Sequence, residues 1–329
     1  MKTKVGVIGL GFMGSAHVRV YKKMKNCELV AICDINPEKK HLAKLYNCKF
    51  YIDPEEFLAE NLDAVSVCTP TSLHMDIVMD ALEKGKHVLV EKPFADSLRK
   101  GKEMAKKAVV MDRLLAVGYV ERFNSAVKKL KDIIDYSQIF STISTRFGPF
   151  PPRTKYCGVF LDLASHEIDL LNYLIGIQPE VLYAHFSSKS DNRFEDYAYI
   201  SLKYGHIHSH IEASWLPNYK LRLINLYGNE RFYYLNYAQQ KLQSYRGPPK
   251  TRIEHGNWSD ILWLSRHVKE DLLVSAKEPL AMELQCFIES VKRNELLDPL
   301  CNTQDALQVL KITDCAFRKA GKRNKFEIV

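Results

Sequence analysis

The sequence predicts an α/β fold: a doubly wound parallel sheet, then a second, α+β domain with a large, mostly antiparallel sheet. In the first part, apolar strand-like segments alternate with helical ones, and a glycine-rich turn joins the first strand to the first helix. In the second part, closely spaced strand-like segments are separated by tight Tyr-Gly turns. At 329 residues the chain is long enough for two domains, which we place at residues 1–120 and 121–329.

The first predicted strand is the β-branched segment 4–10, and the first helix follows at 12–24. Asn36 stands before Pro37 as the N-cap of a further helix. The remaining strands of this part are expected at 28–34, 63–68, 86–90 and 114–120, and its longer helices at 71–84 and 96–110. Strands that are apolar throughout are typical of a parallel sheet covered on both faces by helices.

The second part is predicted as an antiparallel meander with helical cover. Strands are expected at 139–147, 181–187, 197–204, 206–215, 221–227 and 231–235. Helices at 280–293 and 303–320 are expected to cover that sheet, and segment 243–257 is expected to be a polar Pro/Gly loop.

Composition excludes several classes of protein. Apolar residues make up 46% and charged residues 26%, which is ordinary for a globular chain. No apolar run approaches the ~20 residues of a membrane-spanning helix, and glycines interrupt run 5–13, so we expect a cytoplasmic protein. Eight cysteines without a CxxC pair indicate reduced thiols rather than disulfides or zinc.

The formal net charge of +8 is spread along the chain, with no clustered basic stripe or helix-turn-helix. We therefore expect no nucleic-acid partner. A phosphorylated small molecule would be attracted equally well.

The turn Gly9-Leu-Gly11-Phe12-Met13-Gly14 leads directly from the first strand into the first helix. Gly9 permits the tight turn, Gly11 allows a pyrophosphate to approach the backbone, and Gly14 permits close helix–strand packing. The helix then offers unpaired N–H groups to the anion. This pattern predicts a dinucleotide site.

Asp34 ends the second expected strand, where an acidic side chain binds the ribose 2′-hydroxyl. A carboxylate there repels a 2′-phosphate, and no arginine follows at once, so the pattern favours NAD. Lys39 and Lys40 leave NADP open.

Two further motifs follow strands of the same sheet. Thr69, Pro70 and His74 come after the fourth strand, and Glu91 and Lys92 end the fifth. Because ligands of open parallel sheets bind at the carboxyl ends of the strands, all five are predicted to contact the cofactor.

Four blocks together resemble the glucose–fructose oxidoreductase / inositol dehydrogenase / MocA family: GLGFMG at 9–14, TPTSLH at 69–74, ALEKGKHVLVEKP at 81–93 and FLDLASHEIDLLNYLIG at 160–176. The resemblance implies a Rossmann domain and a second domain whose large sheet often forms the oligomer interface, hence a homodimer or homotetramer. It also implies that Lys92, Asp162 and His166 form the catalytic set.

Asp162 and His166 are four residues apart on a predicted helix and so share one face. A carboxylate bonded to one imidazole nitrogen leaves the other free to accept a proton. Lys92 would donate a hydrogen bond to the developing alkoxide. Nearby oxidised nicotinamide would lower the pKa of Lys92, so which of the two side chains takes the proton stays open.

Segment VGYVERFN at 117–124 resembles family members that act on nucleotide sugars, especially UDP-N-acetylglucosamine 3-dehydrogenases. That resemblance implies that Arg122 and Asn124 face the substrate. Arg153 is our candidate for the diphosphate, because a guanidinium fork suits a phosphate. Tyr219 is a further candidate for the pocket wall.

Two other functions are kept as alternatives: a dehydrogenase of a free polyol such as an inositol, and a non-catalytic NAD-binding regulatory protein on the same fold. Retention of Lys92, Asp162 and His166 disfavours the second. His206, His208 and His210 alternate along one strand, but one strand rarely supplies a closed metal site, so we predict no metal.

Overall fold

The computed structural model describes residues 2–150, 157–189, 194–247, 258 and 267–322. The chain divides into two compact units. Within the described residues, the first contains the chain up to Phe123 together with Glu278–Asp314, and the second contains Asn124–Lys277 and residues 315–322. The predicted boundary at residue 120 therefore lies close to the first crossing, but the return of residues 278–314 to the first unit was not predicted.

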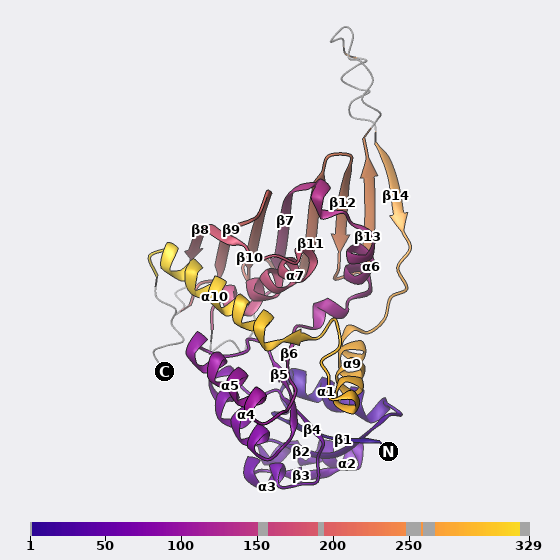
Figure 1. The fold of residues 1–329 in the computed structure, drawn as a ribbon, viewed down its shortest axis with the longest axis vertical. Helices are drawn as coiled ribbons and strands as arrows, with labels where there is room; N and C mark the ends of the chain where they lie inside the picture. Colours follow the sequence, from indigo (N-terminus) through magenta and orange to yellow (C-terminus); the bar gives the residue numbers. More distant parts are fainter. Residues whose placement is uncertain (1, 151–156, 190–193, 248–257, 259–266, 323–329) are drawn as a thin grey trace. The chain divides into compact units, whose positions relative to one another are not determined.

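The first unit is built on a seven-stranded sheet with the order β15-β6-β5-β4-β1-β2-β3 (Figure 1). Its strands are β1 (Thr3–Ile8), β2 (Cys27–Cys33), β3 (Lys49–Tyr51), β4 (Ala64–Val67), β5 (His87–Glu91), β6 (Leu115–Gly118) and β15 (Cys301–Asn302). All neighbours are parallel except β15, which pairs antiparallel with β6. The order reverses between β1 and β4, and ligands of such sheets bind at this switch point.

The helices of the first unit lie on both faces of this sheet (Figure 1). They are α1 (Phe12–Lys23), α2 (Lys40–Tyr46), α3 (Pro54–Leu58), α4 (His74–Glu83), α5 (Leu98–Val110) and α9 (Pro279–Arg293). As predicted, Asn36 caps the turn that Pro37 opens: its side chain accepts a hydrogen bond from the Glu38 N–H at 3.0 Å.

The prediction that helix 280–293 covers the antiparallel sheet is wrong. Leu284 and Phe287 of α9 are buried in the same apolar cluster as Val18 and Tyr21 of α1. The apolar stripe of α9 was visible in the sequence, but a stripe alone does not identify the surface that it covers.

The second unit is built on an eight-stranded sheet with the order β14-β13-β12-β11-β7-β10-β9-β8. Its strands are β7 (Ile139–Phe147), β8 (Glu180–Ser187), β9 (Tyr197–Tyr204), β10 (Ile207–Ser214), β11 (Leu221–Gly228), β12 (Arg231–Asn236), β13 (Lys241–Arg246) and β14 (Val268–Leu272). The neighbours are antiparallel except for the central pair β7 and β10, which is parallel, so the sheet is not a simple meander.

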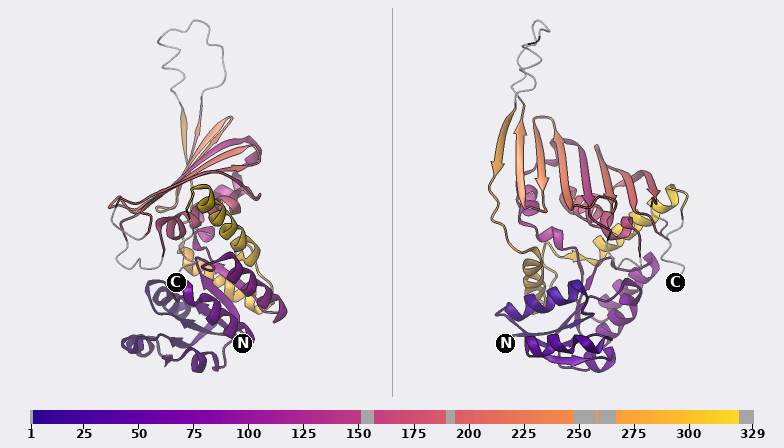
Figure 2. Two further views of the ribbon diagram at one scale, coloured as in Figure 1. Left: turned by 90° about the vertical axis from the view of Figure 1, so that its left-hand side faces the viewer. Right: turned by 180° about the vertical axis from the view of Figure 1, so that it is seen from behind.

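The prediction of a loop at 243–257 fails at its start, because residues 243–246 belong to β13 and pair with β12. Helices α6 (Ser125–Ile133) and α7 (Ser165–Ile175) pack on one face of this sheet (Figure 2).

Helix α10 (Thr303–Lys319) begins in the first unit and ends in the second. Near its start, Leu307 and Leu310 lie against Gly101 of α5. Near its end, Phe317 packs on Phe160 and Phe186 of the second unit, with ring centroids 5.5 and 4.9 Å apart. The predicted cover of the antiparallel sheet is therefore true only of the end of this helix.

Within the described residues, no helix is both long enough and apolar enough to cross a membrane.

Candidate active site

The glycine turn after β1 has the geometry that a dinucleotide requires. Gly9 has a φ of 85°, in the left-handed region that favours glycine. A Cβ at Gly14 would lie 1.8 Å from the Gly9 carbonyl oxygen, so any side chain there would displace the turn. A Cβ at Gly11 would meet nothing within 4 Å, which leaves that side of the turn open.

Helix α1 begins directly after this turn, and no side chain caps its amino end. Phe12 in its first turn is 81% exposed, Met13 is half-buried, and there is no acidic residue in that turn. Exposed N–H groups at the positive end of a helix dipole suit a phosphate. The residues present thus fit the diphosphate of a dinucleotide.

Asp34 lies beside the turn at the end of β2. One carboxylate oxygen accepts the Leu10 N–H at 2.6 Å, and the other accepts the Asn36 N–H at 2.8 Å. Both bonds hold the carboxylate at the turn. Each oxygen has a second lone pair with which to accept a ribose hydroxyl.

The end of β4 is closely packed against the turn, since a Cβ at Gly9 would lie 2.7 Å from the backbone of Cys68 and Thr69. Thr69 is half-buried and Pro70 is exposed. His74 at the start of α4 is buried, with Nε2 3.0 Å from the Thr69 carbonyl oxygen and Nδ1 3.3 Å from that of Phe94.

Burial lowers the pKa of His74 below its ordinary value, so the neutral ring has one N–H to donate. With that one N–H the ring donates to one of the two carbonyl oxygens and lies next to the other. The predicted contact of His74 with the cofactor stays a prediction.

Glu91 and Lys92 stand at the carboxyl end of β5. Lys92 is half-buried, whereas Glu91 is buried and points back into the unit. Its Oε1 lies 3.0 Å from Nε2 of His17 on α1, and its Oε2 accepts the Lys92 N–H at 3.3 Å. We did not single out His17 in the sequence. The signal that could have identified it is its place in the first helix, three residues after Gly14.

His17, Cys68 and Glu91 bring three potential metal-ligand atoms within 4.8 Å of one another. The direct hydrogen bond between His17 and Glu91 accounts for the closeness of these two side chains. Burial, together with Glu91 and Glu283, raises the pKa of Cys68 well above its usual value, which favours the protonated thiol.

The second unit holds the other two predicted catalytic residues. Asp162 is half-buried and lies in a π-helical turn, Phe160–Ala164, and His166 is 7% exposed in the first turn of α7. The Ser165 N–H bonds back to the carbonyl of Phe160, five residues before it. The regular α-helical spacing that we predicted for Asp162 and His166 is therefore wrong at this turn, and π-turns often mark functional sites.

A buried network fixes α7 on the sheet next to His166. Glu167 is fully buried and accepts hydrogen bonds from Ser144, from Tyr237 and, at 3.1 Å, from Nη1 of Arg146. The same Arg146 nitrogen lies 3.2 Å from the Tyr237 hydroxyl. Sequence reasoning missed this network, because its members come from β7, α7 and the residue after β12.

Arg122 and Asn124, the two predicted substrate residues, both make contacts within the protein. Arg122 is 3% exposed and pairs with Asp305 at 2.9 Å. The Asn124 side-chain oxygen caps α6 by accepting the Ala126 N–H at 3.1 Å, and its amide donates to the Tyr237 carbonyl at 2.8 Å. The resemblance of this segment implied substrate contacts for both residues, and those contacts stay a prediction.

Tyr219 is exposed between β10 and β11, so its role as a pocket residue stays a prediction. Arg153 lies outside the described residues.

His210 stacks on Tyr199, whose hydroxyl lies 2.8 Å from its Nδ1, and His208 is exposed on the same face of the sheet.

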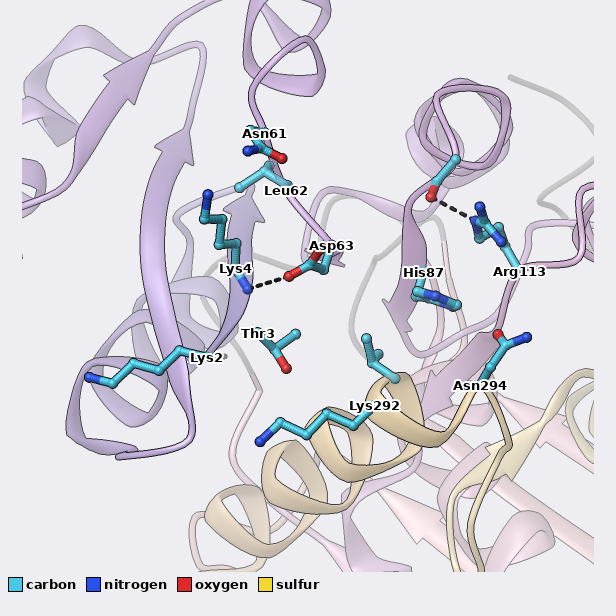
Figure 3. A pocket seen from close by; sticks show the side chains of 12 residues that line it. Lys2, Thr3, Lys4, Asn61, Leu62, Asp63, His87, Arg113, Lys292 and Asn294 are labelled. Carbon is cyan, nitrogen blue, oxygen red and sulfur yellow. Dashed lines mark hydrogen bonds between the residues drawn. The ribbon is translucent and has the colours of Figure 1, made fainter.

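A cavity of about 570 Å³ lies at the amino ends of the strands of the first sheet, opposite the glycine turn (Figure 3). It is lined by residues at the amino ends of β1, β4 and β5, among them Lys4, Asp63 and His87. Arg113 at its wall donates to the Gly85 carbonyl at 2.7 Å. This cavity is therefore separate from the glycine turn and from Lys92.

The first unit thus defines a dinucleotide-binding protein of the doubly wound α/β class. The model of the GFO/IDH/MocA oxidoreductases with an NAD-binding Rossmann fold matches residues 3–119, and the model of that family's C-terminal domain matches residues 139–233. The chain belongs to the GFO/IDH/MocA oxidoreductase family, and the predicted family and two-part fold are confirmed.

Two curated relatives illustrate the range of this similarity. The chain is 32% identical to myo-inositol 2-dehydrogenase of Thermotoga maritima over 55% of its own length and 57% of that protein. It is 25% identical to UDP-N-acetylglucosamine 3-dehydrogenase of Acidithiobacillus ferrooxidans over 88% of both chains.

The solved structures show the same fold. The structure of UDP-N-acetylglucosamine 3-dehydrogenase from A. ferrooxidans superposes with a TM-score of 0.83 over 99% of both chains, at 23% identity. Levoglucosan dehydrogenase in complex with NADH superposes equally well, with a TM-score of 0.83 over 98% of this chain, at 20% identity.

Proposed function

We propose that the protein is an NAD-dependent dehydrogenase that oxidises a secondary hydroxyl of a nucleotide sugar, with C3 of UDP-N-acetylglucosamine as the favoured target. The observation that carries the proposal is the position of the uncapped dinucleotide turn and of Lys92. Both follow the carboxyl ends of strands in one parallel sheet. The extent of similarity favours the nucleotide sugar: the match to the UDP-N-acetylglucosamine enzyme runs through both units, whereas the match to the inositol enzyme spans about half of either chain.

In this proposal, bound NAD supplies the hydride acceptor. His166, oriented by Asp162, takes the proton of the sugar hydroxyl as general base. Lys92 donates a hydrogen bond to the oxygen as negative charge develops on it. The opposite assignment, with Lys92 as the base, is distinguished by the variants described in the Discussion.

A substrate panel tests the proposal directly. Purified protein is mixed with NAD or NADP and with UDP-N-acetylglucosamine, UDP-glucose, myo-inositol or scyllo-inositol, and the absorbance of reduced cofactor is followed. We expect turnover with NAD and UDP-N-acetylglucosamine, and NAD favoured over NADP because the Asp34 carboxylate repels a 2′-phosphate.

Each other outcome of the panel assigns a different function. Activity with inositols alone would replace the nucleotide sugar by a free polyol. Tight NAD binding without turnover of any substrate would support the regulatory alternative.

We also propose that the protein is a homo-oligomer that associates through the face of the eight-stranded sheet opposite α6 and α7. Aromatic side chains line this face, with Tyr227, Phe232 and Tyr245 in a row at centroid separations of 5.1 and 5.4 Å. Tyr183, Tyr199 and His210 form a second row. A sheet face lined by rows of aromatic side chains is suited to pairing with a copy of itself.

Light scattering coupled to size-exclusion chromatography tests the assembly. We expect a dimer or tetramer for the natural chain and a monomer for Tyr199→Asp with Tyr227→Asp, because two buried carboxylates in each copy oppose association. Val109→Asp, on an exposed position of α5, is the control and should leave the mass unchanged. A monomeric natural chain would overturn this proposal.

A further inference from the structure

We infer that His17 is a positioning residue for Lys92, acting through Glu91. The inference deepens the proposed function, since it rests on Lys92 as a residue that contacts the reacting oxygen. His17 itself lies beneath the surface of the first unit, with none of its side chain exposed, so its action is through protein contacts.

The connection consists of two hydrogen bonds. His17 lies on α1, within a turn of Gly14, and its Nε2 is 3.0 Å from Oε1 of Glu91. The other Glu91 oxygen accepts the backbone N–H of Lys92 at 3.3 Å. The helix that begins at the dinucleotide turn is thereby joined to the backbone of the candidate catalytic lysine.

Gly118 on β6 packs closely against the Glu91 carboxylate. A Cβ at Gly118 on β6 would lie 3.0 Å from Glu91 Oε1, so glycine leaves the room that the carboxylate occupies. Within the described residues, Nδ1 of His17 has no hydrogen-bond partner. His17 therefore directs its polar contact toward Glu91, and a carboxylate can only accept from it.

This arrangement has a mechanistic consequence. Without the N–H of His17, Glu91 would be a buried carboxylate that lacks its side-chain donor, and it would turn toward another donor or toward water. The Lys92 backbone, bonded to the same carboxylate, would move with it. A misplacement of about 1 Å at a reacting group can lower the rate about 100-fold.

The variants His17→Phe, His17→Gln and Tyr21→Phe separate positioning from stability. Phenylalanine keeps the ring but lacks the N–H, and glutamine restores a donor. Tyr21→Phe is the matched control: it removes a buried hydrogen bond of 2.8 Å from the same helix, to Ser66 on β4, without touching Glu91 or Lys92.

We expect His17→Phe to lower kcat about 30- to 100-fold while the Kd for NAD changes less than about threefold. We expect His17→Gln to recover at least about a third of kcat, and Tyr21→Phe to keep kcat within about twofold while lowering Tm as much as His17→Phe does. Equal losses of kcat in His17→Phe and Tyr21→Phe would overturn the inference. So would a loss of NAD binding that matches the loss of kcat.

A second readout does not require the substrate. Lys92 is labelled with an amine reagent, with and without saturating NAD, and its modification is followed by peptide mass spectrometry. We expect NAD to slow labelling of Lys92 in the natural chain and in Tyr21→Phe, and to slow it much less in His17→Phe. Such a result would support the inference even if every sugar in the panel failed, whereas equal protection in all three proteins would contradict it.

Metal analysis of the same proteins tests whether His17 is instead a ligand of a bound metal ion. One equivalent of bound zinc in the natural chain, lost from His17→Phe, would make His17 a metal ligand with Cys68 and Glu91 and would overturn the positioning role. We expect less than about a tenth of an equivalent in each protein.

Discussion

Replacement of Lys92 by methionine is expected to lower kcat about 100- to 1,000-fold while NAD binding stays within about threefold. The estimate follows from the loss of a single preorganised donor to an oxyanion. Steady-state kinetics with the substrate found in the panel measure kcat. A titration in which NAD quenches the fluorescence of the protein measures NAD binding. Lys102→Met, at an exposed position of α5, is the matched control and should leave both unchanged.

His166→Asn tests the proton acceptor, with an expected loss of about 100- to 10,000-fold in kcat. The pH profile of kcat/KM then assigns the base. If His166 is the base, the acid limb seen in the natural enzyme is absent from His166→Asn and present in Lys92→Met. Near-native turnover in both variants would contradict the proposed mechanism.

Replacement of Arg146 by methionine is expected to destabilise the second unit by about 3–5 kcal/mol, because it leaves Glu167 buried without its cation. The two side chains are 4% and 0% exposed, and their N···O distance is 3.1 Å. The measurement is the free energy of unfolding of the second unit, from its transition in urea.

Two comparisons make this stability prediction specific. Arg231→Met breaks the exposed pair with Glu270, where N···O is 3.5 Å, and should cost about 1 kcal/mol or less. Adding Glu167→Leu to Arg146→Met should recover part of the loss, since an apolar pair replaces the uncompensated charge. If the buried and the exposed variants cost the same, Glu167 is not held as a buried ion pair.

The parallel sheet was predictable because its strands are apolar throughout and its turn carries three glycines with separate steric tasks. Gly14 is an example: it packs against the Gly9 carbonyl five residues before it, so the need for glycine depends only on neighbouring residues. The spacing of the glycines in the sequence was therefore enough to predict the turn. The positions of Asp34 and Lys92 followed from the same local logic, since each stands where a strand ends.

Contacts between distant segments were not predictable in the same way. The sequence does not reveal that α9 packs on α1, or that Arg146 meets Glu167 and Tyr237, because these pairings depend on how the sheets are ordered. The sequence likewise does not reveal that Arg122 pairs with Asp305, or that the Asn124 amide donates to the Tyr237 carbonyl.

The return of residues Glu278–Asp314 to the first unit has a consequence for biosynthesis. A ribosome delivers the nucleotide-binding half first, yet α9 and the edge strand β15 emerge only after the whole second sheet has been translated. Until then the apolar side of α1 lacks its cover, so the nascent first unit stays incomplete and prone to aggregation. Complete folding of this half therefore has to wait until the second sheet has been translated, even though nearly all of its own strands precede that sheet in the chain.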